Sequence, residues 1–363
     1  MLGAGQLGRM LALAGYPLGF EFTFLDPAKE ACAAALGTHL RAEYSDEAAL
    51  IDLCARSDLV TYEFENVPVA TATFVAARKP LSPSASALAV GQDRLSEKRM
   101  FDDLGIPVPR YAPVDTREAL HVAVNAIGLP SVLKSRRLGY DGKGQATLRA
   151  RDDLDAAWSR LGGQPLILES FVPFEREVSV LGVRSRSGEL AFYPLVENVH
   201  RDGILRTARP RAADPLQATA EDYARRVAEK LQYVGVLAFE FFVVNTTLLA
   251  NEIAPRVHNS GHWSIEGAHC SQFENHLRAI SGLPLGSTQL REPCAMVNFI
   301  GGAPELRLLA SLRGLHPHLY GKAAKPQRKV GHATLLAPDN TALDQALDQL
   351  LPVIDALDFS SHA

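Results

Sequence analysis

The sequence predicts an α/β protein with a small parallel sheet at its N-terminus and further sheets beyond it. A glycine-rich turn at residues 3–8 precedes alternating strand and helix patterns, which are typical of a parallel sheet with ligands at the carboxyl ends of its strands. Segments rich in Ser, Pro and Ala at 81–89, and in Pro at 107–113, break the chain into parts. At 363 residues, the chain is long enough for two or three domains.

Composition and charge narrow the class of protein. With 47% hydrophobic and 21% charged residues, the chain has the composition of a soluble globular protein. Its 37 Lys and Arg against 41 Asp and Glu give a net charge of −4, so no overall field favours nucleic acid or an anionic membrane surface. Any anion that the chain binds must therefore be held by local groups.

The cysteines and the N-terminal segment bear on the compartment. The four cysteines are scattered without CxxC spacing, which argues against a zinc site or a disulfide framework and favours packing roles in a reducing compartment. No apolar run approaches 18 residues, and no basic segment precedes an apolar one. We therefore expect no membrane span, no signal peptide and a cytoplasmic location.

The turn at 3–8 has the pattern GxGxxG and continues into an apolar helical run at 9–15. Only Met1 and Leu2 precede it, so we expect a short first strand. Backbone N–H groups of such a turn converge on an anion at the helix N-terminus. A strand at 20–25 ends in Asp26, where dinucleotide folds place an acid on the ribose, so NAD binding stays open at this point. A helix at 46–56 and a buried strand at 59–64 complete the pattern.

Polar side chains follow the last of these strands, and two cations open the next helix. Glu65 and Asn66 lie where ligands gather in such sheets, although a solvated loop is the alternative. Arg94 and Lys98 are spaced i, i+4 and face one way, as they would on a solvated helix or around an anion.

A lysine and a glycine loop mark the next segment. Lys134 lies within a short apolar strand at 131–135 and needs a partner, because burying an unpaired ammonium is costly. The glycine loop at 139–145 does not match GxxxxGK[ST], so it is not a Walker loop. It fits a mobile flap over phosphates, with a plain hairpin turn as the alternative.

Two acids flank an exposed strand edge farther along the chain. A strand at 165–168 runs into Glu169, Ser170, Phe171 and Val172, and Glu177 follows in the next strand. This arrangement could bind an adenine amino group, its ring and a ribose, although the spacing is generic. His200 lies between two later strand patterns, where a structural role is common.

The pattern at 236–253 predicts a β-hairpin that carries Glu240 and Glu252. Two apolar, β-branched runs flank residues 245–247, which we interpret as a three-residue loop. A symmetric loop pairs 244 with 248, 242 with 250 and 240 with 252. The two carboxylates then stand about 5 Å apart at Cβ, which is destabilising unless a cation lies between them. We therefore expect Mg²⁺, and with it a nucleotide.

Two further segments carry histidines or cations. His258 and His262 are spaced as zinc ligands on a helix would be, but Asn-Ser-Gly between them disfavours a helix and no HExxH is present, so we do not expect metal there. A basic cluster near the C-terminus suits a phosphate, with a solvated loop as the alternative. It consists of Lys322, Lys325, Arg328 and Lys329.

Six motifs in order give the chain a family resemblance over nearly its full length. They are GAGQLGRM at 3–10, YEFENVP at 62–68, QDRLSEK at 92–98, GYDGKGQ at 139–145, the Glu169–Glu177 spacing, and NEIAPRVHNSGHW at 251–263. With them the chain resembles the ATP-grasp superfamily, and within it the N5-carboxyaminoimidazole ribonucleotide synthetases of purine biosynthesis.

The resemblance implies a fold, a reaction and partners. It implies a Rossmann-like domain at 1–90, a small lid domain at 91–172 and a larger domain at 173–363, with the nucleotide between the second and third and the ribonucleotide between the first and third. The implied reaction activates bicarbonate with ATP as carboxyphosphate and transfers the carboxyl to the exocyclic amine of 5-aminoimidazole ribonucleotide. Mg²⁺ or Mn²⁺ would be the metal, and a homodimer is expected.

The resemblance also implies roles for individual residues. Arg256, His258 and Lys134 would take part in catalysis, and Glu240 and Glu252 would bind the metal. The nucleotide would contact Arg94, Lys134, Gly139, Tyr140, Asp141, Gly142, Lys143, Gly144, Gln145, Glu169, Ser170, Phe171, Val172, Glu177, His200, Asn251 and Glu252. The ribonucleotide would contact Gly5, Gln6, Leu7, Glu65, Asn66, Arg256, His258, Lys322 and Arg328.

Three other functions are alternatives to this one. Another ATP-grasp carboxylase or formyl-phosphate ligase, similar to biotin carboxylase or to the glycinamide ribonucleotide transformylase, is the nearest alternative. A catalytically silent nucleotide-binding homologue is a second, although Lys134, Glu240 and Glu252 are intact. An NAD dehydrogenase leaves the two glutamates and the glycine loop unexplained.

Overall fold

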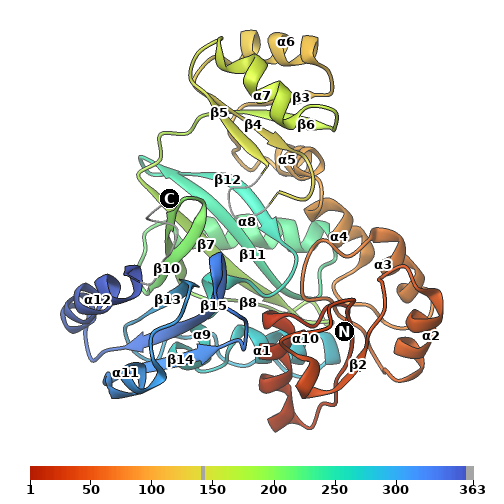
Figure 1. Ribbon diagram of the computed structural model, residues 1–363, viewed down its shortest axis with the longest axis vertical. Coiled ribbons are helices and arrows are strands. Elements are labelled where there is room, and N and C mark those ends of the chain that lie inside the picture. The colour runs from red at the N-terminus through yellow and green to blue at the C-terminus, as the bar shows by residue number, and fades with distance from the viewer. Residues whose placement is uncertain (140–143, 357–363) are drawn as a thin grey trace.

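A computed structural model describes residues 1–139 and 144–356 of the chain and contains three separate sheets (Figure 1). A four-stranded sheet lies at the top of Figure 1, and a nine-stranded sheet runs through the middle. The N-terminal part, whose elements lie within residues 6–91 and include a two-stranded parallel sheet, is below on one side. The C-terminal segment, whose elements lie within residues 294–355, is below on the other side. The predicted mixed α/β architecture is confirmed. Among the described residues, no helix is long and apolar enough to cross a membrane.

The N-terminal part has shorter strands than the sequence pattern predicts. Strand β1 pairs with β2 in parallel, and Leu2 forms single parallel bridges to Leu25 and Tyr62. The predicted strand at 59–64 was wrong in extent, because only Val60 and Tyr62 form bridges there. The elements are α1 (Gln6–Gly15), η1 (Tyr16–Leu18), β1 (Thr23–Leu25), η2 (Ala34–Leu36), β2 (Thr38–Leu40), α2 (Glu47–Ala55), α3 (Val69–Ala76) and α4 (Ala85–Gly91).

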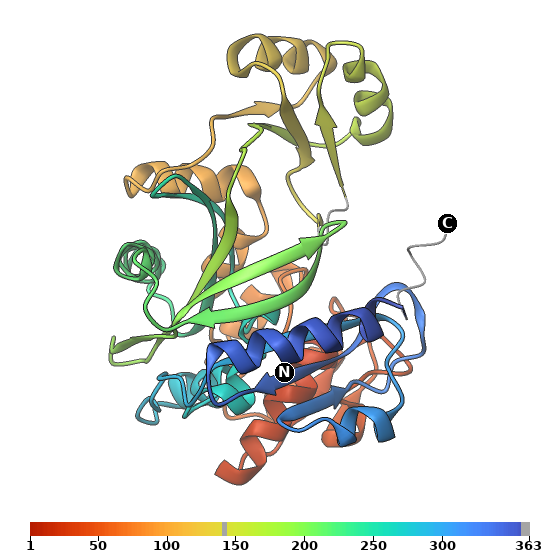
Figure 2. The ribbon, with the colours of Figure 1, turned by 90° about the vertical axis from the view of Figure 1, so that its left-hand side faces the viewer.

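The four-stranded sheet and its two helices form a unit that we call the lid, residues 111–170 without the undescribed 140–143. Helices α6 and α7 cover the outer face of the sheet, which has the order β3-β6-β4-β5 (Figure 2). Its apolar core draws only on residues between 112 and 168. The elements are β3 (Tyr111–Val114), α6 (Arg117–Ile127), β4 (Ser131–Ser135), β5 (Gln145–Leu148), α7 (Asp153–Leu161) and β6 (Leu166–Ser170).

Helix α5 (Arg94–Asp103) connects the N-terminal part to the lid but packs on the nine-stranded sheet. Phe101 stacks on Phe239 at a ring-centroid distance of 4.9 Å, and both belong to the core beneath that sheet. The side chain of Asp93 caps the helix by accepting the N–H groups of Leu95 and Ser96. The predicted domain boundaries at 90/91 and 172/173 stay predictions.

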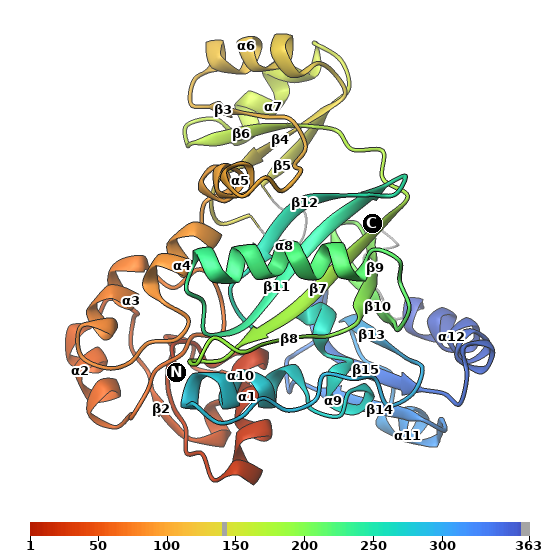
Figure 3. The same ribbon diagram turned by 180° about the vertical axis from the view of Figure 1, so that it is seen from behind.

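The nine-stranded sheet is antiparallel throughout and has the order β12-β11-β7-β9-β10-β13-β15-β14, with β8 beside β7. Helix α8 lies across β7 and β11 (Figure 3). The elements of its first half are β7 (Arg176–Arg184), β8 (Leu190–Phe192), β9 (Leu195–Arg201), β10 (Ile204–Arg211), α8 (Gln217–Lys230), β11 (Gly235–Val244) and β12 (Thr247–Ala254).

The rest of the chain completes the sheet and joins it to the N-terminal part. Leu7, Leu11 and Met10 of α1 share one apolar core with Phe273 and Leu277 of α10. The remaining elements are η3 (Asn259–Gly261), α9 (Ser264–Gly267), α10 (Gln272–Ser281), β13 (Cys294–Gly301), α11 (Leu306–Ser311), β14 (Leu315–Leu319), β15 (Lys325–Leu336) and α12 (Asn340–Asp355).

The β11–β12 hairpin differs from the prediction in its turn. The loop has two residues, Asn245 and Thr246, because Val244 pairs directly with Thr247. Asn245 has φ 54°, a conformation that asparagine tolerates better than most residues. The predicted three-residue loop and the predicted pairs 244–248 and 242–250 were therefore wrong.

A β-bulge restores the pairing of the two acids. Phe241 pairs with Ala250, but Glu240 pairs with Glu252, so that Asn251 is the extra residue on β12. The one-residue difference at the turn and the one-residue bulge cancel. The predicted pairing of Glu240 with Glu252 is confirmed, although the route to it was wrong.

Candidate active site

One large cavity of about 870 Å³ lies where the lid, the nine-stranded sheet, the N-terminal part and the C-terminal segment meet. Of the residues predicted to bind ligands, those that line it are Gln6, Leu7, Glu65, Asn66, Arg94, Lys134, Gly139, Gln145, Glu169, Ser170, Phe171, Val172, Glu177, His200, Glu240, Asn251, Glu252, Arg256, His258, Lys322 and Arg328. Gly5 and Gly144 are not in its wall. Tyr140, Asp141, Gly142 and Lys143 lie outside the described residues.

Lys134 finds the partner that its place in an apolar strand requires. Its ammonium donates to the carboxylate of Glu169 at 2.9 Å, and Lys98 lies 3.8 Å from the same oxygen. Burial alone would raise the pKa of Glu169, but the charges of Lys134, Lys98 and Arg94 outweigh it and lower the pKa to about 2. The other carboxylate oxygen of Glu169 is buried without a protein partner, so it can accept a hydrogen bond from a ligand.

Aromatic rings border the cavity near Glu169. Phe174 and Phe242 stack at 4.9 Å, and Phe171 is 43% exposed at the same wall. Such surfaces suit a flat apolar ring. Phe174 and Phe242 were not predicted from the sequence, although Phe242 follows Glu240 by two residues and shares its strand face.

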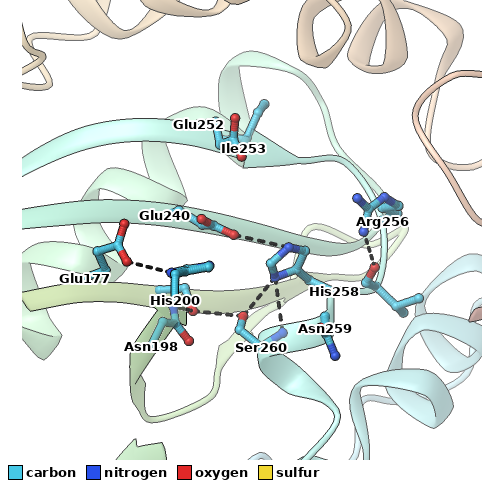
Figure 4. Close-up of polar contacts among 12 residues, drawn as sticks. Glu177, Asn198, His200, Glu240, Glu252, Ile253, Arg256, His258, Asn259 and Ser260 are labelled. Carbon is cyan, nitrogen blue, oxygen red and sulfur yellow. Dashed lines mark hydrogen bonds and ion pairs between the residues drawn. The ribbon is translucent and has the colours of Figure 1, made fainter. Parts of the chain in front are cut away.

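Glu177 and His200 meet across neighbouring strands, and His200 lies within β9 rather than in a loop. Its Nδ1 is 2.6 Å from the carboxylate of Glu177 (Figure 4). Burial would lower the pKa of His200, but the hydrogen bond of Glu177 and the charge of Glu240 raise it. The pair places a carboxylate and an imidazole at the same wall.

Glu240 and Glu252 lie beside each other on β11 and β12, and each has a cationic or polar neighbour. Glu252 accepts a 2.6 Å bond from Arg94, and Glu240 lies 3.1 Å from Nε2 of His258 (Figure 4). Burial, followed by the charge of Glu252, raises the pKa of Glu240 to about 7. Loss of hydration would also raise the pKa of Glu252, but Arg94 and Lys134 lower it.

This acid pair fits a cation that takes its other ligands from outside the protein. Burial and, after it, the like charge of Glu252 raise the pKa of Glu240, and a bound cation would relieve both effects. Nowhere in residues 1–139 and 144–356 do three acidic, His or Cys side chains gather as a metal site. Mg²⁺ is commonly held by one or two carboxylates together with phosphates and water, which is the donor set that this pair would need.

Helix α5 holds the bulge of β12 from the side. Lys98 is fully buried and donates to the carbonyl oxygens of Ala250 at 3.0 Å and Asn251 at 2.7 Å. Glu97 accepts the N–H of Ile253 at 2.6 Å. A solvated Lys98 was one alternative from the sequence, and it was wrong. The i, i+4 spacing could not reveal the role of Glu97.

Arg256 and Glu65 form an ion pair on the side of the N-terminal part. Burial alone would raise the pKa of Glu65, but the charge and hydrogen bond of Arg256 lower it to about 2. Gln92 fixes the loop of Glu65 by donating to the carbonyl oxygens of Glu65 and Val67. The pair therefore stays ionised at neutral pH and presents both charges to the cavity.

His258 lies between this pair and Glu240. Burial and the charge of Arg256 lower its pKa well below the usual value. His262 does not continue a helix with it, because residues Asn259–Gly261 form a single 3₁₀ turn. His262 instead packs against His332 at a ring-centroid distance of 4.7 Å and contacts the amide of Asn259.

The glycine turn at 3–8 is occupied by the chain itself. The carboxylate of Glu63 accepts the N–H groups of Gly5 and Gly8. A Cβ at Gly3 or Gly5 would approach this carboxylate closer than 3.0 Å, which explains the need for glycine. The anion bound at the turn is therefore an internal one, and it already takes the N–H of Gly5.

Asp26, the expected ribose acid, is also used internally. It accepts the N–H of Ala4 at 2.9 Å and the hydroxyl of Tyr44 at 3.1 Å. The glycine turn and Asp26, which left NAD binding open, are thus both hydrogen-bonded within the protein.

The basic cluster near the C-terminus reaches the N-terminal part. Lys322 donates to the side-chain oxygen of Gln6 at 2.5 Å, and Arg328 lines the same end of the cavity. Lys325 and Lys329 are also in its wall. Four cations in the cavity wall, one of which reaches the start of α1, suit a phosphate.

Sequence models of three families match successive parts of the chain. They describe a ribonucleotide synthetase preATP-grasp domain at residues 1–92, an ATP-grasp domain at 99–273, and a phosphoribosylaminoimidazole carboxylase C-terminal domain at 294–346.

Relatives and solved structures agree with these matches. N5-carboxyaminoimidazole ribonucleotide synthase of Pseudomonas aeruginosa is 56% identical and covers 98% of this chain and 99% of its own length. The crystal structure of the synthetase from Thermus thermophilus has 55% identity and a TM-score of 0.93 over 97% of both chains. The enzyme from Aspergillus clavatus, in complex with ADP and 5-aminoimidazole ribonucleotide, has 32% identity and a TM-score of 0.90, covering 98% of this chain and 97% of that one. The chain accordingly belongs to the N5-carboxyaminoimidazole ribonucleotide synthases, a family of the ATP-grasp superfamily.

Proposed function

We propose that the chain is a carbon–nitrogen ligase of de novo purine biosynthesis that converts 5-aminoimidazole ribonucleotide, bicarbonate and ATP to N5-carboxyaminoimidazole ribonucleotide. One observation carries the proposal. A single cavity runs from Lys134 and Glu169 past the acid pair to Gln6 and Lys322, so two ligands bound at its ends would meet in the middle. Support also comes from the related Aspergillus clavatus enzyme, whose structure is described with ADP and 5-aminoimidazole ribonucleotide.

The Glu169 end is proposed to bind ATP. The unpartnered oxygen of Glu169 suits the adenine amino group, the aromatic wall suits the ring, and Glu177 with His200 suits the ribose. Lys134 and Arg94 carry the charges that phosphates need, and phosphoryl transfer depends mainly on such positioned charge.

Glu240 and Glu252 are proposed to hold Mg²⁺, or Mn²⁺ in its place, together with the phosphates of ATP. The direct pairing of the two carboxylates across β11 and β12, with the pKa of Glu240 raised by burial and by Glu252, supports this assignment. When bound, the ion supplies charge neutralisation at the transferring phosphoryl group. Asn251, brought into the cavity wall by the bulge, adds an amide oxygen that is buried without a partner.

The opposite end is proposed to bind the ribonucleotide. Gln6, Leu7, Lys322 and Arg328 surround the expected place of its phosphate. Glu65 and Asn66 line the wall between that place and Arg256, where the aminoimidazole would lie. The predicted contact of Gly5 stays a prediction, with its N–H already bound to Glu63.

The reaction proposed here has two steps. Bicarbonate attacks the γ-phosphorus of ATP, which gives carboxyphosphate and ADP. The exocyclic amine of the ribonucleotide then takes the carboxyl group, either from carboxyphosphate or from CO₂ released in place, and phosphate leaves. Arg256 and His258 lie in the wall between the two ends and are proposed to hold the anionic intermediate.

The proposal is tested by measuring ADP release. With bicarbonate and Mg²⁺ present, 5-aminoimidazole ribonucleotide should stimulate ADP release and be converted to its N-carboxylated product. Stimulation by biotin, or by formate with glycinamide ribonucleotide, would instead favour another ATP-grasp ligase. Nucleotide binding without stimulated turnover would indicate a catalytically silent homologue. Tight binding of NADH would favour an NAD dehydrogenase.

A compartment and an oligomeric state are also proposed, each from a single observation. The four cysteines are all unpaired in thiol form, which supports a reducing compartment such as the cytoplasm. A homodimer is proposed from the family resemblance alone, and light scattering of the purified protein would test it.

A further inference from the structure

A line of buried hydrogen bonds ends on the ring of His258. Asn198 on β9 donates its amide N–H to the hydroxyl of Ser179 on β7 at 2.9 Å, and Ser179 donates to the hydroxyl of Ser260 at 2.9 Å. The Ser260 hydroxyl lies 2.9 Å from Nδ1 of His258 (Figure 4). We call Asn198, Ser179 and Ser260 the relay. Ser179 and Ser260 are completely buried, and Asn198 is 5% exposed.

The direction of these bonds fixes the position of the imidazole proton. The backbone N–H of Ser260 also points at Nδ1 of His258, at 3.3 Å. An amide N–H can only donate, so Nδ1 is an acceptor and carries no proton. The proton of the ring is therefore on Nε2, the nitrogen that faces Glu240 at 3.1 Å.

None of the three relay residues lines the cavity. Their hydrogen bonds connect them to it through His258. The relay crosses three elements, β9, β7 and the 3₁₀ turn η3, and so ties the ring to the rigid sheet instead of to its own loop alone. This arrangement is typical of groups that fix the tautomer and orientation of a functional imidazole.

We propose that Asn198, Ser179 and Ser260 are positioning residues that hold His258 with its proton on Nε2, so that the ring presents a hydrogen-bond donor in the cavity wall, towards Glu240 in this structure and towards the carboxyl group being transferred when substrates are bound. This inference rests on the proposed function. It also means that His258 donates a hydrogen bond through Nε2 and does not accept a proton there. A ring nitrogen that already carries a proton cannot take one from the reacting amine. His258 is then an anion-binding group, beside Arg256, and not the base.

The tautomer can be observed without turnover. In protein with ¹⁵N-labelled histidine, nitrogen shifts separate protonated from unprotonated ring nitrogens, and the signals absent from H258Q identify His258. We expect the wild-type ring to carry its proton on Nε2. Serine-to-alanine variants S179A and S260A should shift the signals towards a mixture of tautomers. S131A is the matched control, because the Ser131 hydroxyl is equally buried, has no partner and lies in the lid sheet.

The kinetic consequence separates positioning from packing. Loss of one such bond should lower kcat with 5-aminoimidazole ribonucleotide about tenfold in S179A and S260A, while the KM for ATP changes less than about twofold. S131A should match the wild type. A proton on Nδ1 in the wild-type spectrum would overturn the proposal, as would kcat values for S179A and S260A equal to that of S131A. Absence of turnover in the wild type would refute the proposed function but would leave the spectrum of His258 interpretable.

Discussion

The ammonium of Lys98 donates a hydrogen bond to the main-chain carbonyl oxygen of Asn251 at 2.7 Å, across the junction of α5 and β12. Asn251 is the extra residue of the bulge, so its carbonyl is turned away from the regular ladder. Lys98 therefore stabilises the backbone shape that pairs Glu252 with Glu240. A buried cation acts here on the main chain and only at a longer distance, 3.8 Å, on the acid Glu169.

Replacing Lys98 by methionine should weaken nucleotide binding. The K98M variant keeps the length of the side chain but removes a donor from two carbonyl groups of β12. We expect the affinity for Mg²⁺–ADP, measured by titration calorimetry, to fall about tenfold, and the affinity for the ribonucleotide to stay unchanged. Lys230, exposed on α8, gives the control K230M. An equal loss of affinity for Mg²⁺–ADP and for the ribonucleotide would contradict the local role of Lys98.

Removing one charge of the acid pair should stop the reaction but spare the fold. For Glu252→Gln we expect kcat to fall by about 100-fold or more, because one proposed metal carboxylate is lost. Ribonucleotide affinity and thermal unfolding should stay near the wild type. Chelation with EDTA should abolish wild-type turnover, and added Mg²⁺ should restore it. Normal kcat in this variant would refute the metal role, and E229Q on the exposed face of α8 is the control.

Glu63 is expected to matter for stability. In E63Q, one of the N–H groups of Gly5 and Gly8 would face the amide NH₂ of the new side chain and lose its acceptor. We expect the free energy of unfolding in urea to fall by about 1–3 kcal/mol. The exposed Glu21 supplies the control E21Q. Unchanged stability would mean that the glycine turn does not depend on the internal carboxylate.

His276 should make the fold sensitive to acid. Burial lowers its pKa to about 4 from 6.5, while its Nδ1 accepts the N–H of Val236. Between these two pH values the unfolded chain binds the proton and the folded chain does not, so stability falls as the pH drops. The loss over the whole window is up to about 3 kcal/mol.

Urea unfolding at pH 7.5 and pH 5 measures this effect. The H276Q variant should be less stable than the wild type at pH 7.5 but should lose less stability on going to pH 5. His121, exposed on α6, gives the control H121Q, which should keep the full wild-type dependence. If H276Q lost as much stability as the wild type between pH 7.5 and pH 5, other buried histidines would account for the pH dependence.

The hairpin shows how far sequence patterns could predict the site. The apolar runs and the two glutamates predicted the pairing of Glu240 with Glu252, and the structure has it. The two-residue turn depends on the backbone of Asn245, and the bulge at Asn251 depends on Lys98, which lies far away in the sequence. Local patterns contain neither fact, and the prediction succeeded because two errors of register cancelled.

Residues that act on other residues were the ones the sequence did not reveal. Lys134 in an apolar strand predicted its own need for a partner, because the cost of burial follows from its local pattern. Glu63, Lys98 and Ser179 gave no comparable signal. Their partners are backbone groups and hydroxyls brought together by the fold, so their roles depend on tertiary contacts.

The apolar core of the lid is separate from the other apolar cores of the described residues. Its links to the α5 segment are polar: Arg136 and Arg137 pair with Asp93 at 2.8 and 3.2 Å, and Tyr111 donates to Asp102 at 2.5 Å. A rotation of the lid about this joint would break ionic contacts and leave the apolar core of the lid intact. Such a rotation would carry little heat-capacity change and would depend on ionic strength more than on temperature.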